Sequence, residues 1–235
     1  MVRAVLKPFA LFALLFTAAC GQPSPSSAPA AAPGTQAPGT SPAPGTLAPG
    51  TPRIVFLGDS LTAGLGLAAD QSYPALIGKK LRDGGYDYEI VNAGVSGDTS
   101  AGGLRRVDWS LEGDVRVLVV ALGGNDALRG LPVDDLRKNL SAILARAHDR
   151  KIQVLLAGME APPNNGPDYT RAFRGVYADL AKQEQVRFIP FLLQGVAGDP
   201  SLNQADGIHP NVRGAQMVAD LVWKELEAML PRPTR

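Results

Sequence analysis

Between residues 53 and 191 the sequence alternates short apolar runs with segments of helical periodicity, and this alternation restricts the possible folds most strongly. The apolar runs are RIVFLG (53–58), YEIVNAG (88–94), VRVLVVALGG (115–124), IQVLLAGM (152–159) and VRFIPF (186–191). They lack the polar alternation of a strand with one face in water, so each is expected to be buried on both sides. Such strands, separated by helices, predict an α/β fold in which helices cover both faces of a central parallel sheet of about five strands.

The segments between and after these runs have the spacing of amphipathic helices. They are residues 73–85, 134–150, 171–185 and 212–230. In the second segment the apolar side chains recur at intervals of three and four residues, at Leu136, Leu140, Ile143, Leu144 and Ala147. Because open parallel sheets bind ligands beyond the carboxyl ends of their strands, the polar residues that follow the strands are the candidates for function. These are Ser60, residues 92–97 and residues 123–126.

The first 19 residues have the layout of a secretory signal. Arg3 and Lys7 precede an apolar run that ends in small residues, and the run is too short for a convincing membrane span. Cys20, the only cysteine, follows directly, and this junction resembles the lipobox of bacterial lipoproteins, with Thr17 where Leu is usual. The resemblance implies that Cys20 is lipidated and becomes the mature amino terminus; secretion without lipidation is the alternative.

Residues 20–52 are predicted to form a disordered tether. From Gly21 to Pro52 the chain has nine prolines, four Pro-Gly-Thr repeats and no charged or aromatic residue, so it cannot bury enough apolar surface to offset its ordering entropy. The remaining residues, 53–231, are then expected to form one folded domain by length. The 23 basic and 22 acidic residues of the chain nearly balance, which gives no indication of a nucleic-acid partner or a polybasic membrane surface.

Only two histidines are available as a catalytic base. His148 lies near the polar end of a predicted helix, where a solvent-exposed role is the simpler interpretation. His209 follows Asp206 by three residues, so the carboxylate can reach the imidazole ring, fix its tautomer and stabilise its protonated form. The alternative is that Asp206, Gly207 and Asn211 only form a turn and a helix cap.

Four blocks together carry a family resemblance: GDSLTAG (58–64), VNAGVSGDT (91–99), LGGND (122–126) and DGIHPN (206–211). Their order and their positions after strands resemble the SGNH hydrolases, the GDSL esterase/lipase superfamily, over residues 53–230. The loop LAGMEAPPNNGPDY (156–169) further resembles the branch that contains bacterial arylesterases, acyl thioesterases and lysophospholipases. The resemblance implies a flavodoxin-like three-layer α/β/α sandwich.

It also implies the roles of individual residues. Ser60 is the nucleophile, His209 its base and Asp206 the third member of a catalytic triad. The N–H groups of Ser60 and Gly94, with the side-chain amide of Asn125, form the oxyanion hole. Asp59 is expected to order the turn around Ser60 rather than to serve as the triad acid.

We therefore expect a serine hydrolase that cleaves aryl or short-to-medium acyl esters, with thioesters or lysophospholipids as further substrates. The acyl group is expected to contact residues 128–133 and 161–168. The alternatives are a carbohydrate O-acetyl esterase and a non-catalytic binding module of the envelope. We expect no cofactor and no metal, since one candidate histidine and one cysteine leave zinc without ligands. The predicted location is the bacterial cell envelope, as an exported monomer anchored in the outer membrane by the lipid on Cys20.

Overall fold

The structure is a computed structural model that describes residues 50–233. The predicted signal segment, Cys20 and nearly all of the predicted tether lie outside the described residues. Within residues 50–233, no helix is long and apolar enough to span a membrane.

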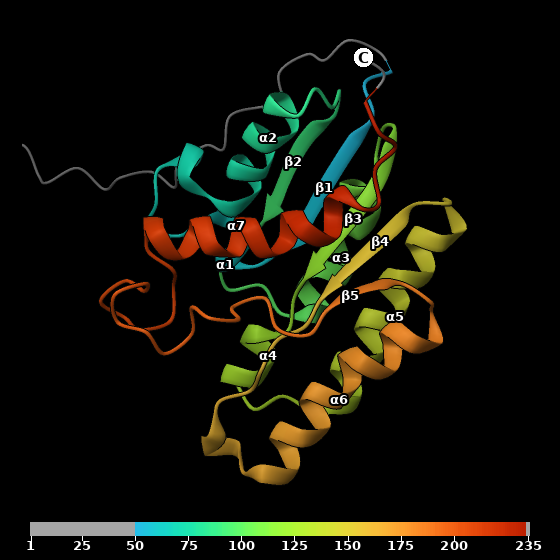
Figure 1. Cartoon of the computed structure of the whole chain (residues 1–235). Coiled ribbons are helices and arrows are strands. Elements are labelled where there is room, and N and C mark those ends of the chain that lie inside the picture. The colour runs from blue at the N-terminus through green and yellow to red at the C-terminus, as the bar shows by residue number, and fades with distance from the viewer. Residues whose placement is uncertain (1–49, 234–235) are drawn as a thin grey trace, which may run out of the picture. The chain divides into compact units, whose positions relative to one another are not determined.

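A single five-stranded parallel sheet forms the centre of the domain, as predicted (Figure 1). Its strands are β1 (Arg53–Gly58), β2 (Glu89–Gly94), β3 (Val115–Ala121), β4 (Gln153–Ala157) and β5 (Arg187–Ile189). The spatial order is β2-β1-β3-β4-β5, and every neighbouring pair is parallel. Gly58 pairs with Gly94 on one side and with Ala121 on the other. The segments that follow β1, β2 and β3 therefore leave the sheet at the same level.

Helices cover both faces of the sheet, which confirms the three-layer α/β/α prediction. The longer ones are α2 (Tyr73–Asp83), α3 (Ser100–Ser110), α5 (Val133–Asp149), α6 (Pro167–Gln183) and α7 (Val212–Glu227). Helix α2 packs against α7, whereas α5 packs against both α3 and α6 (Figure 1). Right-handed crossovers explain this division, because the chain moves from β1 to β2 in one direction and through β3, β4 and β5 in the other. The reversal lies between β1 and β3, where open α/β sheets place their ligand sites.

The core follows the predicted pattern. Strands β1 and β3 are almost wholly buried, and all five apolar positions named for residues 134–150 face inward on α5. Short helical turns follow the strands at the reversal point: α1 (Ser60–Ala63) after β1 and α4 (Gly124–Leu128) after β3. Two 3₁₀ turns, η1 (Ala69–Gln71) and η2 (Pro163–Asn165), lie in the connections that precede α2 and α6.

Helix α3 was not predicted, and its glycines give the reason. Its sequence SAGGLRRVDWS contains Gly102 and Gly103, which lower helix propensity. A Cβ atom at Gly103 would collide with the Leu122 side chain, and one at Gly102 would collide with the Asp98 carboxylate. Close packing against Asp98 and Leu122 requires these glycines. Helix propensity depends only on the local sequence and does not predict such contacts.

Candidate active site

Ser60 is the first residue of α1, and only Asp59 separates it from the end of β1. The side chain of Asp59 caps α1 by accepting a hydrogen bond from the Leu61 N–H at 3.0 Å. Gly64 ends the helix in the left-handed conformation, with φ of 77°. Because the first N–H groups of a helix have no intrahelical partner, the Ser60 N–H is placed at a helix start, where an anion would be favoured by hydrogen bonding.

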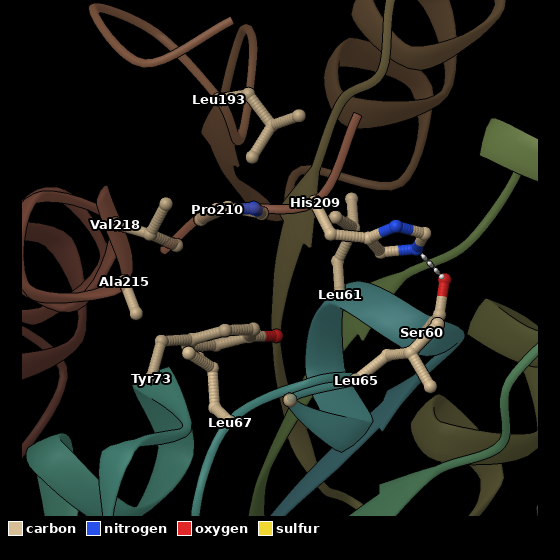
Figure 2. Close-up of a pocket in the computed structure, with 11 residues that line it drawn as sticks. Ser60, Leu61, Leu65, Leu67, Tyr73, Leu193, His209, Pro210, Ala215 and Val218 are labelled. Carbon is tan, nitrogen blue, oxygen red and sulfur yellow. Dashed lines mark hydrogen bonds between the residues drawn. The ribbon is translucent and has the colours of Figure 1, made fainter. Parts of the chain in front are cut away.

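The long segment between β5 and α7 brings His209 to Ser60, although 149 residues separate them in the chain. His209 Nε2 lies 2.8 Å from Ser60 Oγ (Figure 2). On the other side of the ring, His209 Nδ1 lies 2.7 Å from Asp206 Oδ2. The other carboxylate oxygen of Asp206 accepts hydrogen bonds from the N–H groups of Ile208 and His209 at 2.9 and 3.0 Å. Those backbone donors lower the pKa of Asp206 to about 2, helped by its bond to the His209 ring. An ionised Asp206 accepts from Nδ1–H, which leaves the Nε2 lone pair directed at the Ser60 hydroxyl.

Gln204 fixes the histidine segment onto the segment that follows Ser60. Its Nε2 donates to the Leu65 carbonyl at 2.7 Å and to the Pro210 carbonyl at 3.0 Å. A Cβ atom at Gly66, where φ is 79°, would collide with the Gln204 side chain. Gly66 therefore permits the close approach that joins these two segments, and Gln204 is a positioning residue that the sequence did not reveal, since no motif marks it.

Asn125 lies in α4, across the reversal point from Ser60. Its Nδ2 donates to the Asp98 carbonyl at 3.0 Å and to Asp59 Oδ2 at 3.3 Å. Asp59 is only 2% exposed, and this burial raises its pKa to about 6, against the lowering effects of the Leu61 N–H, the His209 charge and the Asn125 amide. Asp59 thus contacts the Asn125 amide and caps α1, in agreement with the ordering role expected for it.

The structure does not leave the Gly94 N–H free for an oxyanion. This amide donates to Asn92 Oδ1 at 3.0 Å, and a Cβ atom at Gly94 would collide with the Ala63 backbone. Gly94 is therefore explained by the packing of β2 against α1, in contrast with the predicted donor role. Gly97, three residues later, has φ of 83°, and its N–H has no hydrogen-bond partner within residues 50–233. The same sequence block thus contains a second glycine that suits an oxyanion donor better.

A cleft of about 720 Å³ opens beside the serine. Ser60, Asn125 and His209 all line it, so the structure brings these three predicted site residues to one cavity. Most other lining side chains are apolar: Leu61, Leu128, Met159, Ala161, Pro162, Pro163, Phe191, Leu193, Ala197 and Ile208. The predicted acyl-contacting segments 128–133 and 161–168 reach the cleft only through their first residues. The segment 191–198 and Ile208 also line it and were not predicted.

Two other predicted site residues, Gly94 and Asp206, and the second histidine, His148, lie outside the cleft lining. His148, in α5, faces Glu184 at 3.5 Å and is partly exposed. Residues 50–233 contain no group of three or more His, Cys, Asp or Glu side chains arranged to hold a metal ion.

Comparisons with known proteins identify relatives over this domain. Residues 56–217 match the GDSL-like Lipase/Acylhydrolase family. Esterase TesA of Pseudomonas aeruginosa is 44% identical over 178 residues, which cover 75% of this chain and 89% of that protein. The Escherichia coli thioesterase 1/protease 1/lysophospholipase L1 is 36% identical over 178 residues, 75% of this chain and 84% of the relative. A crystal structure of TesA superposes with a TM-score of 0.73 at 44% identity, covering 76% of this chain and 99% of that one.

Proposed function

Since the chain belongs to the GDSL-like lipase/acylhydrolase family, we propose that this ester hydrolase works through an acyl-enzyme on Ser60, with His209 as base and Asp206 as its partner. The observation that carries the proposal is the chain of hydrogen bonds from Ser60 Oγ through the His209 ring to Asp206. A serine hydroxyl is a weak nucleophile near pH 7 unless an adjacent base accepts its proton, and His209 Nε2 is within reach to do so.

In the acylation step, Ser60 Oγ forms a bond to the ester carbonyl carbon while its proton passes to His209 Nε2. The carbonyl electron pair moves onto oxygen and gives a tetrahedral oxyanion. When this intermediate collapses, the bond to the alcohol oxygen breaks and the imidazolium protonates the leaving group. Water then attacks the acyl-enzyme with His209 again as base, and the carboxylic acid is released.

The developing oxyanion needs donors that are fixed before the reaction begins. We propose the N–H of Ser60, the amide of Asn125 and the N–H of Gly97 for this role, with Gly97 in place of Gly94. The Gly97 amide, which has no partner within residues 50–233, and the bonded Gly94 amide support this choice. Both Nδ2 hydrogens of Asn125 already have partners, so Asn125 must share or exchange the longer bond, to Asp59, when the oxyanion forms.

The substrates that the cleft supports best are esters with an apolar acyl or aryl group. Its lining is mostly aliphatic and also includes Met159 and Phe191, and its volume is within the range of small-molecule sites. Thioesters and lysophospholipids are proposed as further substrates because the Escherichia coli relative is named for both activities.

For location, we propose an exported enzyme of the cell envelope, held at the outer membrane by a lipid on Cys20. The support is the sequence alone: a signal-like segment, a following cysteine and an uncharged Pro-rich tether. Two or more acyl chains are needed for stable anchoring, as a lipidated amino-terminal cysteine would supply.

A labelling experiment tests the catalytic proposal. The wild type should react with a fluorophosphonate probe and hydrolyse p-nitrophenyl butyrate, whereas Ser60→Ala should lose both activities with an unchanged circular dichroism spectrum. An unlabelled wild type would favour a non-catalytic binding module. Rates on p-nitrophenyl esters of increasing chain length, acyl-CoA, lysophospholipid and acetylated xylan then separate the substrate classes. Acetyl release from xylan without turnover of aryl esters would favour the O-acetyl esterase alternative.

A further inference from the structure

Arg106, on α3, binds three segments of the chain with one guanidinium group. Its Nη2 donates to the Gly58 carbonyl at 2.8 Å, its Nη1 to the Ala93 carbonyl at 2.7 Å, and its Nε to Asp98 Oδ2 at 2.7 Å. The side chains of Arg106 and Asp98 are only 18% and 15% exposed. Charge-assisted bonds of this length in a largely water-free position are strong and hold their partners in a defined geometry.

Two of these partners connect directly to the proposed oxyanion donors. Gly58 is the last residue of β1, two positions before Ser60, so its carbonyl helps to set the direction in which the chain enters α1. Asp98 follows Gly97, and its main-chain carbonyl accepts the 3.0 Å hydrogen bond from Asn125 Nδ2. Arg106 therefore connects the backbone before Ser60 to the turn that contacts Asn125 and contains Gly97.

The surrounding structure is shaped for this ion pair. Gly102, one turn before Arg106 on α3, has no side chain where the Asp98 carboxylate lies, and a Cβ atom there would collide with Asp98 Oδ1. The carboxylate thus occupies a space that exists only because residue 102 is glycine. A fold that needed only a helix at this position would gain stability from alanine there.

We propose that Arg106 is a positioning residue for the oxyanion hole: it fixes the distance between the Ser60 N–H and the donors held by the Gly97–Asp98 turn. The inference rests on the proposed acyl-enzyme mechanism. Arg106 does not line the substrate cleft, so its effect falls on the stabilisation of the transition state rather than on the binding of the ester. Lysine cannot replace it, because an ammonium on a flexible stem does not reproduce three bonds from a planar fork.

The test compares Arg106→Lys, Arg106→Met and Gly102→Ala in the full chain, with Asn125→Ala as the reference for direct loss of a donor. Two controls match them. Arg105→Met removes the neighbouring exposed arginine of the same helix. Gly175→Ala adds a methyl group to α6 at a position where a Cβ atom would meet no other side chain or segment within 4 Å. The readouts are kcat and KM for p-nitrophenyl butyrate, per active site as counted with the fluorophosphonate probe, together with the urea midpoint.

We expect Arg106→Lys and Gly102→Ala to lower kcat by about 10- to 100-fold with KM within about threefold, as when an interaction made only in the transition state is lost. The inhibition constant of an alkyl trifluoromethyl ketone, whose adduct carries an oxyanion, should rise by the same factor. The pH midpoint of kcat/KM should not move, because the variants leave the His209–Asp206 contact in place. Both controls should behave as wild type.

Two results would overturn the inference. One is a kcat per labelled site that stays at the wild-type value in the folded variants, which would reduce Arg106 to a stabilising role. The other is a loss of kcat without any change in trifluoromethyl ketone affinity. The proposed mechanism fails separately, if the wild type is not labelled or if Ser60→Ala remains active.

Discussion

The buried carboxyl group of Asp59 should make the stability of this protein depend on pH in a direction opposite to that of an ordinary paired carboxylate. Asp59, beside the proposed nucleophile Ser60, is 2% exposed, and desolvation raises its pKa from the ordinary 3.8 to about 6. In the folded chain the group therefore holds its proton to a higher pH than in the unfolded chain. Between pH 4 and 6 the folded state binds more protons, so stability falls as pH rises through this window.

The magnitude follows from the size of the shift. A difference of about two pKa units, at 1.36 kcal/mol each, gives about 2–3 kcal/mol of stability that is present at pH 4 and lost by pH 8. Asp59→Asn removes this titration while it keeps a side-chain oxygen that can cap α1 through the Leu61 N–H. Changes in hydrogen bonding at this site, including the contact with Asn125, contribute equally at both pH values and cancel when the two measurements are subtracted.

The assay is urea unfolding of wild type and variant at pH 4 and pH 8, followed by circular dichroism. We subtract the free energy of unfolding of wild type from that of Asp59→Asn at each pH. This difference should be about 2–3 kcal/mol larger at pH 8 than at pH 4. Asp87→Asn, at an exposed position, is the matched control, and its difference from wild type should stay constant within about 0.5 kcal/mol. The reasoning would be refuted if the difference in unfolding free energy between Asp59→Asn and wild type did not change with pH, or if it were larger at pH 4 than at pH 8.

Two further substitutions test the triad and the anchor. Asp206→Asn keeps an oxygen for the Ile208 and His209 N–H groups but places an amide donor opposite His209 Nδ1, which favours the tautomer with Nε2–H facing Ser60. Because Asp206 is half-exposed, kcat for p-nitrophenyl butyrate should fall by about 10²–10³, which is less than for a buried triad carboxylate. A fall of less than tenfold would contradict a role of Asp206 in fixing the His209 tautomer. Cys20→Ser should move the protein from the membrane fraction to the soluble fraction on immunoblots if a lipid anchors it, whereas retention in the membrane would point to the uncleaved amino-terminal segment.

The sheet and most of its covering helices could be predicted because their signal is local and repeated. Apolar runs without polar alternation predicted the five strands, and apolar side chains spaced three and four residues apart predicted the buried face of α5. Helix α3 was missed because Gly102 and Gly103 are required by contacts with Asp98 and Leu122, and contacts of this kind leave no periodic trace in the sequence.

The site was predictable only in part. The register of β1, β2 and β3 explains why the polar residues after these strands gather at one edge, and this follows from the α/β pattern alone. The position of His209 does not follow from it, because the chain from β5 to α7 has no regular element and is held by side-chain bonds such as those of Gln204. For His209 and Asp206 the sequence had to be compared with a family whose members share the motif.

The choice between Gly94 and Gly97 shows where a motif ceases to be informative. Both glycines belong to the block VNAGVSGDT, and either could give a backbone donor close to a substrate. Asn92 favours Gly97 as the proposed donor, because its Nδ2 donates to the Thr62 carbonyl at 2.9 Å, which turns its Oδ1 toward the Gly94 N–H. Thr62 lies 30 residues away in α1, so which amide remains unpaired depends on how α1 packs beside β2. A backbone N–H can serve the oxyanion only if the fold leaves it without a stronger partner, and a motif names only the residues from which such donors are drawn.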